Sequence, residues 1–515
     1  GVLSRFPACR DAGRSLPGDP GAVVFEDAVR ACGGNPTAMF RLGEAYLRGT
    51  CLPRLPEDAV LWFRRAADSG SADGTVALGK CCRDGIGTAR NPHEAYLLFS
   101  RAANCGHTAG TYYTAVCCLD GIGVARDRER AVQLLRTATE QGSRRAAYRL
   151  AVCLRDGVGT PPDLKGALAL FRSCAAAGHA GAQCALGRLY ESGRGVPQDD
   201  TEAVRLYRTA AQAGHAGAMF RLGRCAYEGR GCEKNHEEAA EWYRRAAQKG
   251  STEGTYYLGM CYEFGDGIAR DLARAAELYR TAAEKGYAPA QNNLGGCLLF
   301  GNGVPKDETA AVAWLQKAAK QREPNACYRL ALCLRDGVGT APDAERSLHL
   351  LETAGERRQP RALLLLASYS ETGRYGKADY ARAAKYYRKA AACGSAEGQY
   401  GIGMCYRTGR GVVRDAGTAF RWLCLAANGG DRRAQYEVGE CYRCGIGVVR
   451  DLCEAVRNYT LAADGEDGIA AADYRLGMCY LRGEGVLRDV ETARALLQHA
   501  VEKGNTDAMR VLGDC

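Results

Sequence analysis

Apolar residues recur along most of the chain at the spacing of one helix face. Between residues 218 and 226 they follow intervals compatible with 3.6 residues per turn: Ala218, Phe220, Leu222, Cys225 and Ala226. A glycine ends this stretch. A second helical pattern then opens with capping-box spacing, as at Asn91 with Glu94 three residues later. The pattern predicts pairs of short helices joined by tight turns.

The helix pair repeats with a period of 36 residues. Thirteen units run from Asn35 to Gly504; twelve have 36 residues and one, Asp431–Gly468, has 38. One position of the repeat, which we call a slot when it is compared between units, lies directly after the first helix. It is Gly in all thirteen units: Gly49, Gly85, Gly121, Gly157, Gly193, Gly229, Gly265, Gly301, Gly337, Gly373, Gly409, Gly445 and Gly483. Glycine enters the left-handed conformation at low cost, so this slot predicts a helix C-cap. We call it the closing glycine of each unit.

The second helix of each unit alternates small and large residues on one face. An Ala such as Ala59 is followed four residues later by a large residue such as Phe63, and three residues further by Ala66. Small residues allow backbones to approach while large ones fill the space between neighbouring hairpins. No unit can bury this face alone, so the repeats are expected to stack into an all-α solenoid.

The repeated pattern resembles the Sel1-like repeat family, a relative of the tetratricopeptide repeats. Runs such as AMFRLGRCAYEGRGCEKNHEEAAEWYRRAAQKG (Ala218–Gly250) carry the resemblance, which covers more than nine-tenths of the chain. It implies a right-handed α-solenoid, a superhelix of about 13 two-helix repeats of 36 residues, at 35–504. Half-repeats are expected at 23–34 and 505–515, after an irregular N-terminal extension at 1–22. It also implies a non-catalytic scaffold or adaptor, a subunit of a larger protein complex.

Length, charge and hydropathy restrict the classes of function that fit this chain. The chain has 515 residues, 69 basic and 59 acidic, for a net charge of +10. Nucleic-acid modules concentrate charge more strongly, so a nucleic-acid partner is disfavoured. A binder of nucleic acid or anionic membrane that uses the diffuse positive charge remains an alternative. The longest aliphatic run, Leu363–Leu366, is far below the roughly 20 residues of a membrane-spanning helix.

The chain contains 25 cysteines, and eleven of them share one slot of the first helix. These are Cys81, Cys117, Cys153, Cys225, Cys261, Cys297, Cys333, Cys405, Cys441, Cys479 and Cys515. Free Cys packs as a small hydrophobe, so we expect buried, reduced thiols. That favours a reducing compartment, the cytosol or an organelle interior after import, over secretion. A disulfide-bonded branch of the family implies a Cys174–Cys184 bridge as the alternative, and with it a hydrolase function.

The sequence contains no complete motif for metal binding, phosphate binding or catalysis. The pair Cys441 and Cys444 lacks a second Cys pair for zinc, and Gly74–Lys80 (GTVALGK) is followed by Cys81 where a phosphate loop needs Ser or Thr. His107, His179 and His215 each begin a repeat and are expected to shape the turn between units. We therefore expect no catalytic, cofactor-binding or metal-ligating residues.

Two positions of the first helix, those of Arg221 and Arg224 in their repeat, belong neither to the predicted core nor to a predicted helix cap. They hold a mixture of Arg, Tyr and Met that suits protein recognition, with these candidate partner-binding residues: Arg41, Tyr113, Arg149, Arg188, Arg221, Arg224, Tyr257, Met260, Arg329 and Arg475. By analogy with related solenoids they would line the concave face and bind acidic extended or helical segments of partner proteins. The alternative is a solvated helix face with ion pairs between residues four apart. Charge reversal at Arg221 and Arg224 should weaken binding and leave thermal stability unchanged.

The repeat pattern departs from that of the other units between residues 321 and 376. Arg322 and Arg358 replace the glycine that ends two consecutive repeats, where a side chain in a left-handed cap costs roughly 1 kcal/mol. We predict a hinge or altered curvature at 321–376. Two extra residues near Glu466 are expected only to lengthen a loop.

Overall fold

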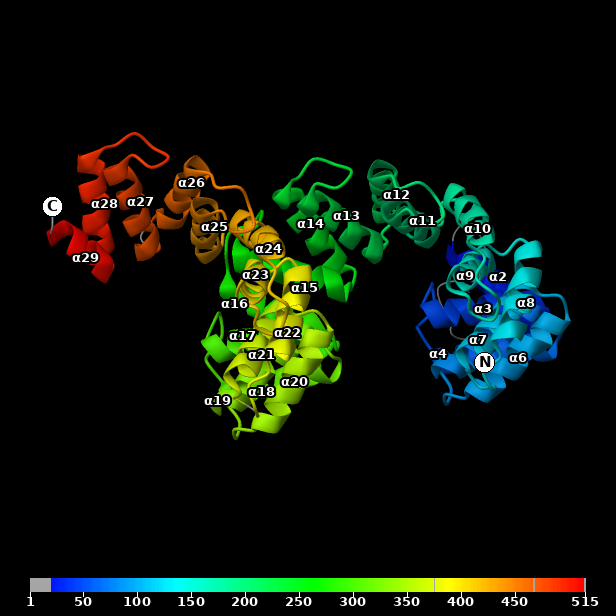
Figure 1. The fold of residues 1–515 in the computed structure, drawn as a ribbon. Coiled ribbons are helices and arrows are strands. Elements are labelled where there is room, and N and C mark those ends of the chain that lie inside the picture. Colours follow the sequence, from blue (N-terminus) through cyan, green and yellow to red (C-terminus); the bar gives the residue numbers. More distant parts are fainter. Residues whose placement is uncertain (1–19, 375, 466–467, 514–515) are drawn as a thin grey trace. The chain divides into compact units, whose positions relative to one another are not determined.

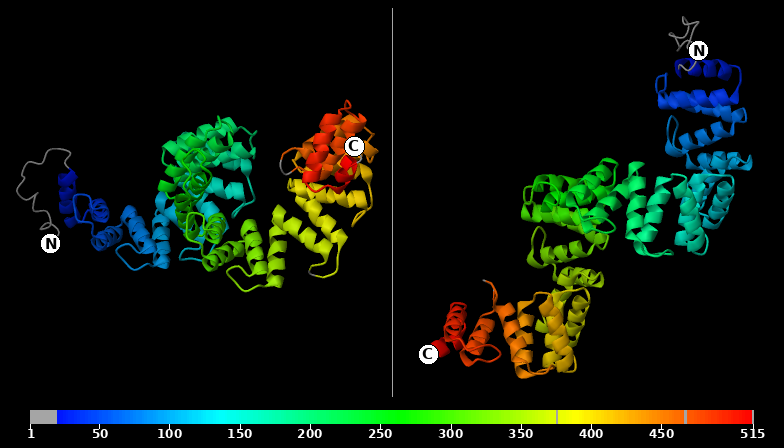
Figure 2. Two further views of the ribbon diagram at one scale, coloured as in Figure 1. Left: turned by 90° about the vertical axis from the view of Figure 1, so that its left-hand side faces the viewer. Right: turned by 90° about the horizontal axis from the view of Figure 1, so that it is seen from above.

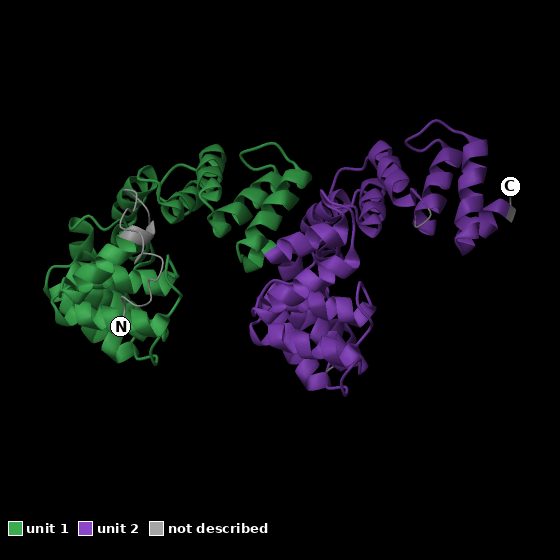
Figure 3. Cartoon of the chain, turned by 180° about the vertical axis from the view of Figure 1, so that it is seen from behind, with its two compact units in different colours: residues 1–254 green, residues 255–515 purple. Residues whose placement is uncertain are grey.

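The computed structural model describes residues 20–374, 376–465 and 468–513. This part of the chain forms 28 helices and contains no strand (Figure 1). It divides into two compact units, residues 1–254 and 255–515 (Figure 3). The predicted extension at 1–22 lies almost wholly in residues 1–19, outside the described part. The all-helical repeat predicted from the sequence is confirmed.

The helices are nearly uniform in length. The first unit contains α2 (Pro20–Cys32), α3 (Pro36–Arg48), α4 (Pro56–Asp68), α5 (Ala72–Asp84), α6 (Pro92–Asn104), α7 (Thr108–Asp120), α8 (Arg128–Glu140), α9 (Arg144–Asp156), α10 (Leu164–Ala176), α11 (Ala180–Ser192), α12 (Asp200–Gln212), α13 (Ala216–Glu228) and α14 (His236–Gln248). The boundary between the units falls within α15 (Thr252–Phe264), most of which belongs to the second unit. The second unit also contains α16 (Leu272–Glu284), α17 (Ala288–Phe300), α18 (Glu308–Lys320), α19 (Pro324–Asp336), α20 (Ala344–Glu356), α21 (Pro360–Thr372), α22 (Tyr380–Ala392), α23 (Ala396–Thr408), α24 (Ala416–Asn428), α25 (Arg432–Cys444), α26 (Leu452–Ala463), α27 (Ala470–Arg482), α28 (Val490–Glu502) and α29 (Thr506–Gly513). Odd-numbered helices from α3 are the first helices of repeats, and even-numbered helices from α4 are the second. Within each unit, a helix packs mainly on its two neighbours in sequence (Figure 2).

A glycine recurs inside the first helix of many repeats, usually after a Leu, and marks a close approach to the second helix of the same hairpin. A Cβ on Gly79 of α5 would lie 2.7 Å from Cε1 of Phe99 in α6, and one on Gly187 of α11 would lie 2.7 Å from Cε1 of Tyr207 in α12. Phe99 and Tyr207 are both fully buried. The glycine makes room for the large residue of the second helix within the same hairpin. From the sequence, that residue was expected to fill the space between neighbouring hairpins.

The predicted caps form as expected. The closing glycine Gly49 adopts φ 73° and its N–H donates to the carbonyl of Ala45. Asn91 caps α6 by accepting from the N–H of Glu94 at 3.1 Å. The histidines that begin repeats are caps as well: Nδ1 of His215 accepts from the N–H of Ala218 at 3.1 Å. These local hydrogen bonds satisfy groups that a helix end leaves unpaired.

A second glycine, two residues after the closing one, joins neighbouring repeats. Gly123 has φ 72°, and a Cβ there would lie 2.0 Å from the carbonyl oxygen of Pro92, the first residue of the preceding second helix. Such an approach leaves no space for any side chain. The Gly-x-Gly turn therefore serves repeat stacking.

The 23 described cysteines are free thiols. Cys81, Cys117 and Cys225 are buried, and burial raises the pKa of Cys81 to about 11 and that of Cys225 to about 12. Cys174 and Cys184 are both buried and unpaired, so the bridge implied by the disulfide-bonded branch is absent.

Arg322 and Arg358 take left-handed conformations, with φ 59° and 61°. The hinge at 321–376 itself stays a prediction. The extra residues near Glu466 fall between α26 and α27, where 466–467 lie outside the described part. Each described helix has at most thirteen residues, too few to cross a bilayer.

Candidate functional site

Three of the predicted partner-binding residues meet in one groove of the first unit. Arg188 comes from α11, and Arg221 and Arg224 come from α13. The groove has a volume of about 620 Å³. Its other charged residues are Arg155, Asp156, Glu191, Arg194 and Arg230, from α9, α11 and the turns that follow α11 and α13. We call this the arginine groove.

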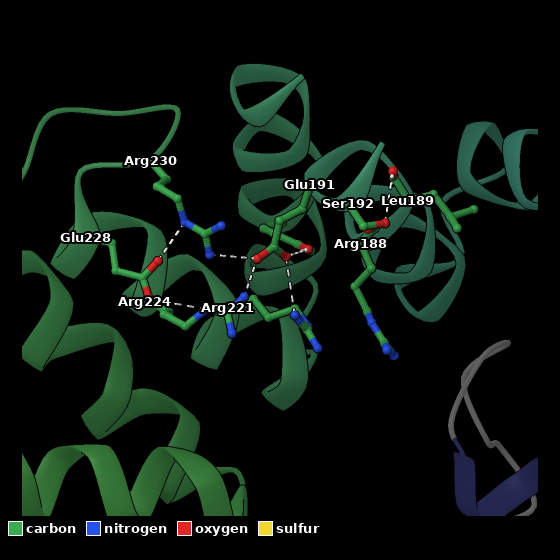
Figure 4. Close-up of polar contacts among 9 residues, drawn as sticks. Arg188, Leu189, Glu191, Ser192, Arg221, Arg224, Glu228 and Arg230 are labelled. Atoms are coloured by element: carbon green, nitrogen blue, oxygen red, sulfur yellow. Dashed lines mark hydrogen bonds and ion pairs between the residues drawn. The ribbon is translucent and has the colours of Figure 1, made fainter. Parts of the chain in front are cut away.

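Glu191, near the end of α11, is the centre of the arginine groove (Figure 4). Its Oε2 accepts from the Tyr207 hydroxyl at 2.6 Å and lies 3.3 Å from Nη1 of Arg221. Its Oε1 accepts from Nη2 of Arg230 at 2.9 Å and also contacts Arg224. One carboxylate thus joins three arginines of the next repeat and the core tyrosine of its own.

Neighbouring charges and a hydrogen bond keep the Glu191 carboxylate ionised although it is mostly buried. Its side chain is only 11% exposed, and burial opposes ionisation. The hydrogen bond from Tyr207 and the charges of Arg224, Arg221 and Arg230 outweigh burial, so the pKa of the Glu191 carboxyl lies below its usual value. The carboxylate therefore neutralises one of the three guanidinium charges around it.

A second ion pair lies among the residues that line the arginine groove. Arg155 binds Asp156 through two hydrogen bonds of 2.7 Å, and this contact lowers the pKa of the Asp156 carboxyl. Six arginines thus face two carboxylates among the lining residues, which leaves four positive charges in excess. Glu228 offsets part of this excess by contacting Arg230 at 2.6 Å.

Two arginines of the groove are available to a ligand. Arg188 is exposed and forms no hydrogen bond or ion pair with the described residues; in Figure 4 it points away from Glu191. Arg194, also exposed, donates only to the backbone carbonyl of Arg155, at 3.4 Å. Guanidinium groups in this state suit a carboxylate, which takes two parallel hydrogen bonds.

The other predicted residues of the first unit are held by neighbouring repeats. Arg149 contacts Asp120 at 3.2 Å, 29 residues earlier. Arg41 lies 3.9 Å from Asp27. Tyr113 stacks on Phe99 with ring centroids 5.0 Å apart.

In the second unit the predicted residues likewise contact their surroundings. Nη1 of Arg329 donates to the carbonyl of Asn292 at 3.1 Å, and Arg475 pairs with Glu440 at 3.1 Å. Tyr257 packs edge-on against Tyr256, and Met260 packs on an apolar core. Most ion pairs along these slots therefore link repeats, rather than residues four apart as the alternative supposed. Arg224 with Glu228, at 3.8 Å, is an exception. That these slots form one concave binding face stays a prediction.

Glu191 and the arginines of the turns were not among the residues predicted from the sequence. A signal was present, because Glu occupies the slot two residues before the closing glycine in three units, each with Tyr 16 residues later: Glu191 with Tyr207, Glu263 with Tyr279, and Glu371 with Tyr387. Arg194 and Arg230 share another slot, directly after the closing glycine. Among the described residues, no group of three or more His, Cys, Asp or Glu side chains is placed to hold a metal ion.

Comparisons with known proteins agree with this architecture. The Sel1 repeat family matches thirteen segments: 36–71, 72–107, 108–143, 144–179, 180–215, 216–251, 252–287, 288–322, 324–358, 360–395, 396–431, 432–467 and 470–505. The structure of c5321, a protective antigen of uropathogenic Escherichia coli with an SLR fold, is similar with a TM-score of 0.55 and 28% identity, over 88% of this chain and 97% of that one. A Sel1 repeat protein from Oxalobacter formigenes is 32% identical over 47% of this chain and 96% of its own, with a TM-score of 0.44. A comparison with curated proteins finds no match.

Proposed function

We propose that this chain, which belongs to the Sel1 repeat family, is a non-catalytic scaffold that binds an acidic segment of a partner protein in the arginine groove. Sel1 repeat solenoids generally act as scaffolds for protein interactions. The proposal adds the place and the chemistry of binding for this chain. An extended or helical segment with several carboxylates would cross α11 and α13.

The unbalanced charge of the arginine groove carries the proposal. Glu191 and Asp156 are already bound by Arg221, Arg224, Arg230 and Arg155. These pairs leave the positive excess of the groove in place. A bound acidic side chain would restore the balance without breaking an existing pair.

Arg188 and Arg194 provide the recognition contacts in this proposal. Both are exposed and neither is bound to an acidic side chain. Arginine forks bind carboxylates with defined geometry, which supplies specificity as well as attraction. The surrounding positive potential would speed association with an acidic segment and make its rate sensitive to salt.

The test uses the full chain and a fluorescein-labelled polyglutamate peptide as the probe. We expect the variant R188E/R194E to weaken binding by about tenfold or more, because two attractive contacts become repulsive. The matched control is R136E/R172E, which changes the charge by the same amount at exposed arginines of α8 and α10. Fluorescence anisotropy measures both affinities.

Two results would contradict the proposal. If the control variant loses as much affinity as R188E/R194E, binding depends on net charge and not on the arginine groove. If neither variant differs from the unchanged chain, the peptide binds elsewhere. A thermal unfolding curve for each variant separates loss of binding from loss of fold.

A further inference from the structure

Three loops of the second unit expose large apolar side chains. Val413, Val449 and Leu487 are 88%, 85% and 89% exposed. They occupy the same slot, four residues after the closing glycine, in three consecutive repeats. The loops join α23 to α24, α25 to α26, and α27 to α28 (Figure 1). Because these helices pack in series, the three loop tips follow one edge of the unit.

The slot is different in the ten preceding repeats. It holds small, constrained or charged residues there: Pro53, Ala89, Ala125, Pro161, Pro197, Glu233, Ala269, Pro305, Ala341 and Lys377. The fold therefore does not need a large apolar residue at this position. Exposed large apolar residues at equivalent sites of three consecutive repeats make this series of loops a candidate for a surface that a partner covers.

The loops hold these side chains in an outward position. The preceding residues Val412, Val448 and Val486 are partly buried against the cores of their repeats. Two residues after each tip, Asp415, Asp451 and Asp489 cap the following helix through backbone N–H groups. Because the residue before the tip is packed and the Asp two residues after it is fixed as a cap, the tip side chain projects into solvent.

An arginine follows each exposed apolar residue. Arg414, Arg450 and Arg488 are exposed, and none forms a hydrogen bond or ion pair with the described residues. The adjacent carboxylates are occupied as helix caps. We call these six residues, Val413, Arg414, Val449, Arg450, Leu487 and Arg488, the loop-tip ridge.

Three equivalent arginines in other repeats, each of which follows an Ala, behave differently. Where Ala fills the tip slot, the arginine turns back onto the preceding helix. Arg90 donates to the carbonyl of Arg83 at 3.2 Å, Arg126 to that of Asp120 at 3.3 Å, and Arg270 to that of Glu263 at 2.9 Å. The loop-tip ridge thus combines exposed apolar groups with unbound positive charges, a combination that these other loops do not show.

We propose that the loop-tip ridge docks this protein on an anionic membrane surface. Val413, Val449 and Leu487 would enter the headgroup region, and the three arginines would bind lipid phosphates and carboxylates. Apolar insertion combined with attraction to anionic lipid is the usual basis of reversible interfacial binding. This inference goes beyond the scaffold function and concerns different residues.

Shape favours a membrane over a peptide as the occupant. The apolar side chains are separate projections nearly 90% exposed, so a peptide would contact one of them per repeat and leave it mostly in water. The three tips follow one edge of the unit, so a deformable lipid surface can receive them together, with the arginines at its charged boundary.

The test is co-sedimentation of the full chain with phosphatidylcholine vesicles and with mixed phosphatidylcholine–phosphatidylserine vesicles. We expect binding to the mixed vesicles and little to phosphatidylcholine alone. The variants V413S/V449S/L487S and R414Q/R450Q/R488Q should each bind about tenfold more weakly or worse. Control variants at the equivalent slots, A89S/A125S/A269S and R90Q/R126Q/R270Q, should bind like the unchanged chain.

Several results would overturn this proposal. It is wrong if the unchanged chain fails to sediment with mixed vesicles, or if the ridge variants bind as well as it does. Equal losses in the arginine variant and its control would assign binding to net charge. A purified partner protein that contacts the ridge, with no vesicle binding, would make it a protein interface instead. The ridge variants should keep their affinity for polyglutamate, so failure here is distinguishable from failure of the arginine groove.

Discussion

The hydroxyl of Tyr387 donates a hydrogen bond to the Glu371 carboxylate, 16 residues earlier, at 2.9 Å. It joins the core of a second helix to the end of the first helix in the same repeat. Two other repeats form the same contact. Repeats with Phe in the Tyr slot have Leu or Arg in the Glu slot, as in Phe63 with Leu47. A buried hydroxyl needs a hydrogen-bond partner, whereas a phenyl ring does not.

The Tyr–Glu pair predicts non-additive effects on stability. E371L should lower the free energy of unfolding by about 1 kcal/mol, because the half-buried Tyr387 hydroxyl loses its charged acceptor. The double variant E371L/Y387F reproduces the pairing of Leu47 with Phe63 and should recover most of that loss. Urea unfolding followed by circular dichroism measures each variant. Simple addition of the two single effects would show that the pair is not coupled.

Glu191 changes the expectation for Arg221 and Arg224. From the sequence, their reversal was expected to leave stability unchanged, but both contact a carboxylate that is 11% exposed. R221E/R224E should therefore destabilise the chain by about 3 kcal/mol or more, since Glu191 would face two like charges. R188E/R194E should unfold like the unchanged chain. Equal midpoints for all three proteins in urea would contradict this prediction.

The second glycine of the turn predicts a steric cost. Gly123 and Gly142 both have positive φ, but a Cβ at Gly142 would meet nothing within 4 Å. G142A should cost about 1–2 kcal/mol from backbone strain alone. G123A adds a clash with the Pro92 carbonyl and should cost clearly more. Thermal unfolding compares the two variants, and similar midpoints would show that the repeats shift apart without penalty.

His215 predicts a loss of stability in acid. Burial, helped by the charge of His179, lowers the pKa of His215 below its usual 6.5. The unfolded chain therefore binds the proton first, so stability is complete above about pH 6.5 and falls as the pH drops through the folded pKa. Protonation of Nδ1 also removes the acceptor that caps α13.

The replacement H215S isolates this effect. Serine caps other first helices of this chain, as Ser71 does for α5, and it does not titrate. The variant should match the unchanged chain in urea at pH 8 and lose less stability at pH 5. An identical pH dependence in both proteins would remove His215 as its source.

Burial predicts which cysteines react. Cys32, Cys51, Cys105, Cys444 and Cys453 are exposed and should be alkylated rapidly by iodoacetamide at pH 8. The ten described thiols of the shared first-helix slot, from Cys81 to Cys479, are buried and should react only after unfolding, because burial keeps them protonated and inaccessible. Peptide mass spectrometry after timed labelling measures this. Rapid labelling of Cys81 or Cys225 in the folded chain would contradict the packing.

Much of the fold was predictable because its determinants are local. A closing glycine such as Gly49 and a cap such as Asn91 act through groups within four residues of each other. The site was only partly predictable. Arg188, Arg221 and Arg224 could be selected by slot, but Arg221 meets Glu191 from 30 residues away. Such a contact depends on how two repeats stack.

The sequence by itself determined the number of repeats, the helix ends and the identity of the buried residues, since each unit carries the same short-range chemistry. Only the tertiary structure decided which charges pair and which stay unbound. Arg224 and Arg188 occupy the same slot of adjacent repeats, yet the first binds Glu191 and the second binds no acidic side chain. The position equivalent to Glu191 one repeat earlier is Arg155, so Arg188 meets a like charge there. The physical reason is that ion pairing depends on which side chains two stacked repeats bring within reach, and the stacking that brings residues 30 or more positions apart together is a tertiary property.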